Sequence, residues 1–265
     1  MRKYLLLCIC SVIFGCSKSG SLSLENEEGL YTPIPVSLEV PPLFEQLLID
    51  PIIPTNNPLT EEGISLGKKL FFEPRLSKDN SKSCASCHNP SQAFSDVNQF
   101  SIGVEGQPGT RNAMPLFNLA WNFSDRFAWD GKELGLERQA LEPIRNPIEL
   151  HGNWTEIAEM LQQDEEYPIL FQQAFGSATI DSTLVAKAIG QFERTLISGN
   201  SKYDQYLQGN ATLTSQELNG LDVFLREDKG DCFHCHGSPN NHYGQTMNST
   251  TMVWMHPFQT WVWVP

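Results

Sequence analysis

Apolar residues recur at helical spacing in three segments of the chain, residues 60–72, 181–196 and 214–225. The apolar positions near one face of these segments are Ile64, Leu70 and Phe71, then Leu184, Ala188, Phe192 and Leu196, then Leu218, Leu221 and Leu225. The candidate N-caps are Thr60, Asp181 and Thr214, the last of which forms a capping box with Glu217. No series of alternating apolar and polar residues indicates strands, so we predict an all-α fold.

The N-terminus has the pattern of a bacterial export signal. Arg2 and Lys3 precede an apolar run over residues 5–14, which is too short to span a bilayer. A glycine before Cys16 resembles a lipobox. We therefore expect residues 1–15 to be a signal peptide that is cleaved before Cys16, with Cys16 then lipidated.

Residues 16–55 are polar and rich in proline, and we interpret them as a lipidated N-terminus and tether. A plain secretory signal that is cut nearby is the alternative. Both interpretations place the mature protein in the periplasm or cell envelope. The lipid anchor would then be its only contact with the membrane.

The charge of the chain is strongly acidic. Lys and Arg together number 18 against 31 Asp and Glu, a formal net charge of −13. Such a surface argues against a nucleic-acid partner, because it cannot neutralise phosphates. It would attract a basic partner by long-range electrostatics, or it would simply keep the protein soluble.

The cysteines are arranged for haem attachment. Three of the seven cysteines lie in the signal region, and the other four form two Cys-x-x-Cys pairs, each followed by histidine. In this c-type motif two thiols bond one haem and the adjacent histidine ligates its iron. Zinc would need both pairs together, and no βαβ pattern supports a redox dithiol. We predict attachment through Cys84, Cys87, Cys232 and Cys235, with His88 and His236 as iron ligands.

Longer phrases around these motifs resemble the bacterial di-haem cytochrome c peroxidases. They include "LGKKLFFEPRLSKDNSKSCASCHNPSQAFSD", "GTRNAMPLFNLAW", "FAWDGKELGLERQALEPIRNPIEL" and "AIGQFERTLISGNSKYDQYL", within residues 58–239. The resemblance implies two cytochrome c-like haem domains, a peroxidatic one over 56–200 and an electron-transfer one over 201–265. It also implies reduction of hydrogen peroxide to water with electrons from a small periplasmic cytochrome c or copper protein.

The resemblance assigns roles to five residues. It makes His88 the ligand of the peroxidatic haem and Glu149 the residue that moves a proton between the peroxide oxygens. Gln139 becomes the pocket partner of Glu149, and Trp129 an electron bridge between the haems. Asn112 is a weaker candidate for a calcium ligand. From the residues alone, a helix-start charge, a core aromatic and a solvated amide remain alternatives for Glu149, Trp129 and Gln139.

Val104 departs from the family pattern. Many relatives carry a histidine here that caps the peroxidatic iron in the oxidised enzyme, and valine cannot ligate iron. We predict a first haem that is open in its resting state. A related enzyme that matures a tryptophan cofactor also has an open haem, so oxidation of an amino-acid side chain is a second hypothesis. A di-haem electron carrier and an inactive remnant are further alternatives.

The last residues of the chain, from about residue 240, lack the family motif. Read from the third base of each codon, residues 247–255 give Glu-(Phe/Leu)-x-x-x-Gly-(Leu/Val/Met)-Asp if Ser249 has a TCN codon, which resembles the family's "EFHNNGLD". We hypothesise a frameshift near 240–245 and an incomplete second domain. The alternative is a divergent tail in which Met247, Met252 or Met255 ligates the second haem. Relatives are often dimers, so a homodimer is one expected partner.

Overall fold

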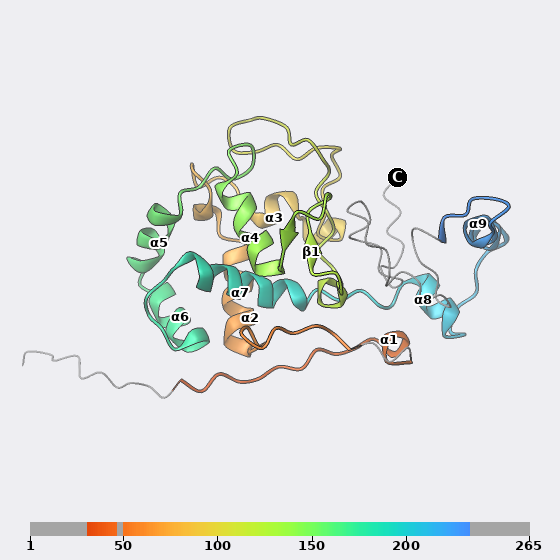
Figure 1. Ribbon diagram of the computed structural model, residues 1–265, viewed down its shortest axis with the longest axis horizontal. Helices are drawn as coiled ribbons and strands as arrows, with labels where there is room; N and C mark the ends of the chain where they lie inside the picture. Colours follow the sequence, from red (N-terminus) through yellow and green to blue (C-terminus); the bar gives the residue numbers. More distant parts are fainter. Residues whose placement is uncertain (1–30, 47–49, 234–265) are drawn as a thin grey trace, which may run out of the picture. The chain divides into compact units, whose positions relative to one another are not determined.

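The computed structural model describes residues 31–46 and 50–233 (Figure 1). The α-helices of this part are α1 (Pro42–Gln46), α2 (Glu61–Phe71), α3 (Cys84–Cys87), α4 (Leu136–Arg145), α5 (Trp154–Gln162), α6 (Tyr167–Phe175), α7 (Ser182–Arg194), α8 (Lys202–Leu207) and α9 (Ser215–Leu225). Short 3-10 turns are η1 (Pro74–Leu76), η2 (Pro90–Gln92) and η3 (Leu119–Trp121). The mostly helical character that we predicted is confirmed.

The three helices predicted from the hydrophobic pattern form, and each begins at its predicted cap. The Thr60 hydroxyl accepts a hydrogen bond from the Gly63 amide at the start of α2, and the Asp181 carboxylate accepts one from Leu184 in α7. The capping box of Thr214 and Glu217 opens α9. These side chains satisfy amide groups that have no partner within the helix.

The core lies where α7 crosses α2 and α4 (Figure 1). Glycine at position 67 permits this approach, because a Cβ atom there would lie 1.9 Å from the carbonyl oxygen of Ala188. Apolar side chains of α2, α4, α5, α6 and α7 fill the interior. Its fully buried members include Leu66, Leu70, Ile144, Leu161, Tyr167, Phe171, Ala188 and Ile189.

One small antiparallel hairpin interrupts the helical fold. Strands β1 (Arg126–Phe127) and β2 (Glu133–Leu134) pair with Phe127 opposite Glu133. Two residues are too few to produce an alternating pattern, so the sequence did not indicate these strands. The hairpin matters for the site because Trp129 lies in its turn.

Residues 31–46, which lie in the range expected to be a tether, contact the helical domain. The Val36 amide donates to the Leu59 carbonyl at 3.0 Å, and the Tyr31 hydroxyl donates to the Ala174 carbonyl at 3.1 Å. Phe44 is fully buried and packs edge-on against Trp121, with ring centroids 5.0 Å apart. The expected signal peptide and Cys16 lie outside the described residues.

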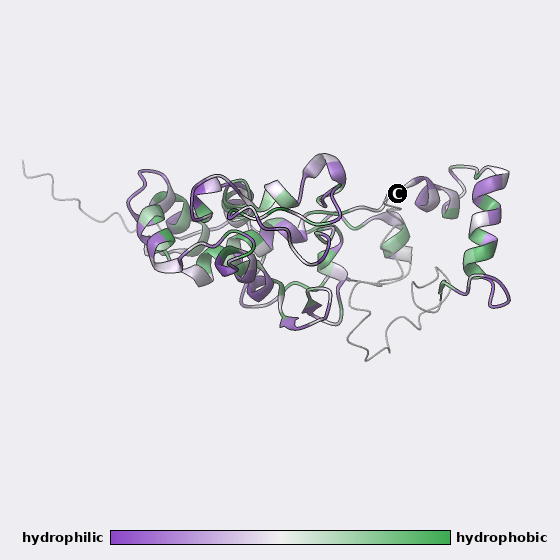
Figure 2. Cartoon of the chain, turned by 90° about the horizontal axis from the view of Figure 1, so that it is seen from above, coloured by the Kyte–Doolittle hydropathy of each residue, from purple (hydrophilic) through white to green (hydrophobic). Residues whose placement is uncertain are grey.

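Helix α9 leaves its apolar positions accessible. None of its residues is buried, and Leu218 is 43% exposed. Figure 2 shows hydrophobic residues, coloured green, along this helix. Within residues 31–46 and 50–233, no helix has the length and apolar character to cross a membrane.

Candidate active site

The first haem-attachment motif forms a single helical turn. Cys84 and Cys87 are the first and last residues of α3, so the three-residue spacing directs both thiols to one side. Ser86 accepts a hydrogen bond from the Ser83 amide at 3.0 Å and fixes the start of the turn. The His88 amide donates to the Cys84 carbonyl at 2.9 Å and ends it. Both cysteines are free thiols in the structure.

His88 is oriented by the loop that follows it. Its Nδ1 lies 3.1 Å from the Phe94 carbonyl oxygen. A carbonyl only accepts, so Nδ1 is the donor in this contact. Ala93 and Phe94 adopt left-handed conformations, with φ of 54° and 56°, which turn this carbonyl back toward the ring. Burial lowers the pKa of His88 and favours the neutral form that ligates a metal.

Apolar side chains surround the motif, as a haem requires. The buried ones are Phe71, Leu116, Leu119, Phe127, Leu136 and Phe192, and Cys84, Ala85, Phe94 and Leu196 pack against them. Phe71 is central, with its ring centroid 5.3 Å from that of Phe192 and 6.1 Å from that of Phe94. These residues come from α2, η3, β1, α4, α7 and the loops between them, so the tertiary fold rather than one segment forms the walls.

Glu149 lies beside this motif. Its Oε1 accepts a hydrogen bond of 2.6 Å from the side-chain amide of Asn146. Burial raises the pKa of Glu149, although the Asn146 bond opposes the rise. Burial also raises the pKa of the Cys84 and Cys87 thiols, and the charge of Glu149 adds to both effects. The carboxylate is therefore within electrostatic reach of both cysteines.

Gln139 lies on α4 with a buried oxygen that has no hydrogen-bond partner. In the part of the chain that the structure describes, its Oε1 is the one buried side-chain oxygen or nitrogen without a partner. Leaving such an acceptor unpaired costs about 1–3 kcal/mol. A bound molecule that donates a hydrogen bond would remove this penalty, so Gln139 fits the wall of a ligand site.

The loop that contains Val104 is held against Glu149. The Val104 amide donates to the Glu149 carbonyl at 2.8 Å. A Cβ atom on Gly103 would lie 2.1 Å from the Ile148 carbonyl oxygen, so only glycine permits this approach. The next residue is Glu105, whose Oε1 accepts a hydrogen bond from Lys78 Nζ at 2.6 Å. The same oxygen lies 2.8 Å from His151 Nδ1.

Trp129 and Asn112 are brought together. The indole Nε1 of Trp129 donates to the Asn112 carbonyl at 2.7 Å, while the side chain of Trp129 remains 42% exposed. The Asn112 side-chain amide donates to the Asn98 carbonyl at 2.7 Å and thereby fastens the loop after the haem motif. Among the described residues, no group of three His, Cys, Asp or Glu side chains could hold a metal ion.

Residues 61–212 match the family model for the di-haem cytochrome c peroxidase domain. The chain belongs to this family. The methylamine utilization protein MauG of Methylorubrum extorquens is 39% identical over 187 residues, which are 70% of this chain and 52% of that protein. The cytochrome c551 peroxidase of Nitrosomonas europaea is 39% identical over 194 residues, 72% of this chain and 55% of its own. The chain thus spans about half the length of these relatives.

Two solved structures have a similar fold. A MauG-like protein associated with microbial copper homeostasis is 35% identical and aligns with a TM-score of 0.66 over 75% of this chain and 59% of its own. The di-haem peroxidase BthA of Burkholderia thailandensis aligns with a TM-score of 0.63 over 76% and 56%, at 23% identity. The family implies haem c as the cofactor, and the apolar walls, the neutral His88 imidazole and the unpaired Gln139 oxygen fit such a group.

The second haem motif of this family member is described only at its start. The Cys232 amide donates to the Phe224 carbonyl at 3.1 Å, which places the first cysteine just after α9. Cys235, His236, the three tail methionines and the expected frameshift region lie outside the described residues. The predictions made for them therefore remain predictions.

Two residues of the site were not singled out from the sequence. Asn146 holds the Glu149 carboxylate, and its only sequence signal is its place three residues earlier in "NPIE". Glu193 is 6% exposed near the end of α7, and burial raises its pKa to about 8. After burial, its charge is the largest cause that raises the pKa of Cys84. A glutamate at a helix end gives no sign of this in the sequence.

Proposed function

We propose that this protein is a di-haem peroxidase that reduces hydrogen peroxide to two waters, consuming two electrons and two protons. Cys84 and Cys87 would hold the first haem, and His88 would ligate its iron. The single observation that carries the proposal is the half-buried Glu149 carboxylate, whose pKa is raised by burial and whose charge reaches both cysteines of this motif. A general acid or base must lie within reach of the reacting oxygens, and its pKa is best raised toward neutrality.

Three residues, Glu149, Asn146 and Gln139, have proposed roles in the reaction of the bound peroxide. When bound, the haem would supply the redox chemistry of the reaction. Glu149 would take a proton from one peroxide oxygen and deliver it to the other, which would leave as water. Asn146 keeps the carboxylate in place through its 2.6 Å hydrogen bond. The Gln139 oxygen accepts a hydrogen bond from the bound peroxide and orients it.

The remaining steps concern electrons. We propose that they enter from a small periplasmic cytochrome c or copper protein at the second haem, held by Cys232, Cys235 and His236. Trp129 would bridge the two haems. The net charge of −13 would attract a basic donor. Export, lipidation at Cys16, calcium at Asn112 and a homodimer belong to the same proposal.

Oxidation of an amino-acid side chain is the second candidate, and Val104 is the observation that favours it. Valine cannot ligate iron, and two matched relatives carry the name methylamine utilization protein MauG. An electron carrier would not react with peroxide. A long-lived oxidised haem state in the absence of a donor would favour the side-chain chemistry over peroxide turnover.

Steady-state oxidation of a reduced small cytochrome c by peroxide tests the proposal. We expect turnover by the di-haem protein, and a loss of about 100-fold or more in Glu149→Gln, since general acid–base catalysis contributes ~10²–10⁴-fold. Glu159→Gln is the matched control, because it removes the same charge from an exposed position on α5. Equal turnover in the two variants would refute the role of Glu149, and no turnover in any of them would refute the peroxidase function.

A further inference from the structure

The helix that contains Gln139 starts without a capping side chain. Gly135 precedes α4 with φ of 88° and offers no side chain to the free amides of the first turn. Glu137, in that turn, is instead held by Arg194 of α7. The guanidinium donates to both carboxylate oxygens, from Nη1 to Oε1 at 2.6 Å and from Nη2 to Oε2 at 3.1 Å. Bidentate pairs of this kind fix orientation as well as distance.

The pair is enclosed by protein. The Arg194 side chain is 5% exposed, and that of Glu137 is 24% exposed. Burial acts to raise the pKa of Glu137, but the bonds from Arg194 and Asn57 outweigh it and leave the pKa lowered. A Cβ atom on Gly190 would lie 3.2 Å from Arg194 Nη1 and 3.3 Å from Glu137 Oε1. The surface of α7 is thus shaped around the two side chains.

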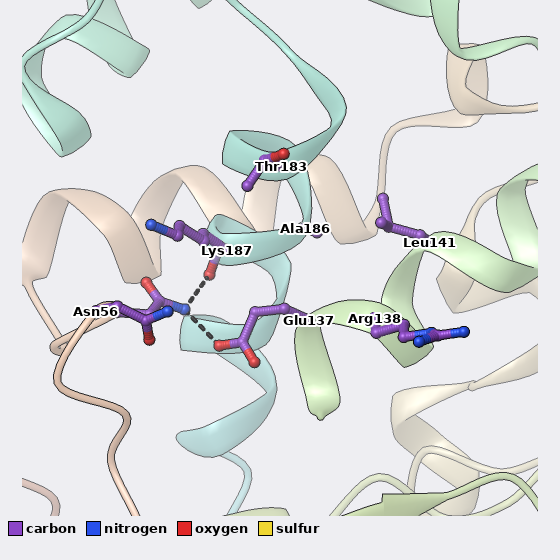
Figure 3. Close-up of a pocket in the computed structure, with 8 residues that line it drawn as sticks. Asn56, Glu137, Arg138, Leu141, Thr183, Ala186 and Lys187 are labelled. Carbon is purple, nitrogen blue, oxygen red and sulfur yellow. Dashed lines mark hydrogen bonds between the residues drawn. The ribbon is translucent and has the colours of Figure 1, made fainter. Parts of the chain in front are cut away.

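Asn57, in the segment before α2, also binds the Glu137 carboxylate. The side-chain amide nitrogen of Asn57 donates to Glu137 Oε1 at 2.6 Å and to the backbone carbonyl of Lys187 at 3.1 Å. The Gln191 side-chain amide donates in turn to Asn57 Oδ1 at 2.9 Å. Figure 3 shows Glu137 and Lys187 at the small pocket that these segments line, with the two hydrogen bonds from Asn57 dashed. Glu137 is therefore fixed from two directions.

The position of Glu137 bears on Gln139 through the geometry of the helix. Glu137 and Gln139 are two residues apart, so their side chains are separated by about 200° around the helix axis and leave opposite sides of α4. A rotation of the helix by about 10° would move a side-chain end that lies ~6 Å from the axis by about 1 Å. A misplacement of this size is enough to reduce a reaction rate by about 100-fold.

We propose that the Glu137–Arg194 pair positions Gln139 by fixing the rotation of α4. Arg194 is then a positioning residue for the peroxide site, although it lies on another helix. This inference rests on the proposed function and extends it to residues outside the pocket. A merely structural role would lower stability but would not act through Gln139.

A double-mutant cycle distinguishes the two roles. In the full di-haem protein we expect Arg194→Lys to slow the reaction of the first haem with peroxide about 10- to 100-fold, because lysine cannot form the bidentate pair. In a Gln139→Leu background the same substitution should change the rate less than about 2-fold, since the residue that it positions is gone. An equal loss in both backgrounds, or no loss in either, would overturn the proposal.

Arg75→Lys is the matched control. Arg75 also forms a bidentate pair, with Glu73 at 2.8 Å and 2.7 Å, but that pair is fastened to Tyr167 of α6 rather than to α4. It should leave the peroxide rate unchanged in both backgrounds. The cyanide affinity of the ferric first haem is a second measurement of the same cycle. If peroxide does not react at all, non-additive cyanide affinities would still support the positioning, while additive ones would refute it.

Discussion

Glu193→Gln should stabilise the protein increasingly as the pH rises. Glu193 is 6% exposed, and burial raises its pKa from 4.5 to about 8. The positive charge of Arg194 partly opposes the rise in this pKa. However, Nη1 and Nη2 of Arg194 both donate their hydrogen bonds to Glu137. At neutral pH the side chain is therefore protonated when folded and ionised when unfolded, which lowers the free energy of unfolding.

The magnitude follows from the difference between the two states. This group's contribution to stability is fully present below its unfolded pKa of 4.5 and is lost as the pH rises toward its folded pKa of about 8. The loss is about 1.4 kcal/mol per pH unit, or roughly 3 kcal/mol at pH 7. Glutamine has the shape of the protonated acid and no titration, so it avoids this loss.

Urea unfolding followed by far-UV circular dichroism at pH 5.5, 7.0 and 8.5 measures the effect. The advantage of Glu193→Gln over the native protein should rise from about 1 kcal/mol to about 3 kcal/mol between the first two values, and further at the third. Glu159→Gln, at an exposed position, should show no such slope. A constant difference across this range, or a destabilised variant at every pH, would refute the reasoning.

Three further predictions concern the cap, the core and the open haem. Asp181→Ala should lower the free energy of unfolding by about 1 kcal/mol in urea, because it removes the acceptor for the Leu184 amide, and a change below about 0.3 kcal/mol would contradict the capping role. Phe171→Ala should lower the free energy of unfolding by about 3–5 kcal/mol in the same assay, because it leaves a cavity in the core. Ile169→Ala should lower it by less than about 1 kcal/mol, since Ile169 is 58% exposed on the same helix, and equal losses would contradict the core role of Phe171. Val104→His should make the ferric first haem low-spin and slow to react with peroxide until it is reduced, whereas Val104→Leu should not; an unchanged optical spectrum for Val104→His would show that the loop does not face the iron.

The sequence predicted the helices well where one local signal determined them. Thr60, Asp181 and Thr214 each satisfy helix amides within three residues, so their role is independent of the rest of the fold. The hairpin around Trp129 escaped prediction because each strand has two residues and its position depends on packing of Phe127. The burial of Phe44 against Trp121 was also hidden, since a Pro-rich segment has no periodicity that would indicate a core contact.

The candidate site was predictable in its residue types but not in its surroundings. The haem motif and the family phrases identified Cys84, His88 and Glu149. Nothing local in the sequence shows that the Phe94 carbonyl orients His88, since a left-handed turn at Ala93 produces that contact. Likewise, the pKa of Glu193 is raised by its burial in the fold, and the charge of Glu137, a residue distant in sequence, adds to the rise.

A single-turnover reaction tests the central proposal most directly. The ferric di-haem protein is mixed with a small excess of hydrogen peroxide in a stopped-flow spectrometer without any donor, and the Soret band of the first haem is followed. We predict a fast reaction that is linear in peroxide concentration and needs no prior reduction, and a rate at least about 100-fold lower for Glu149→Gln. Equal rates for the native protein and Glu149→Gln would contradict the account.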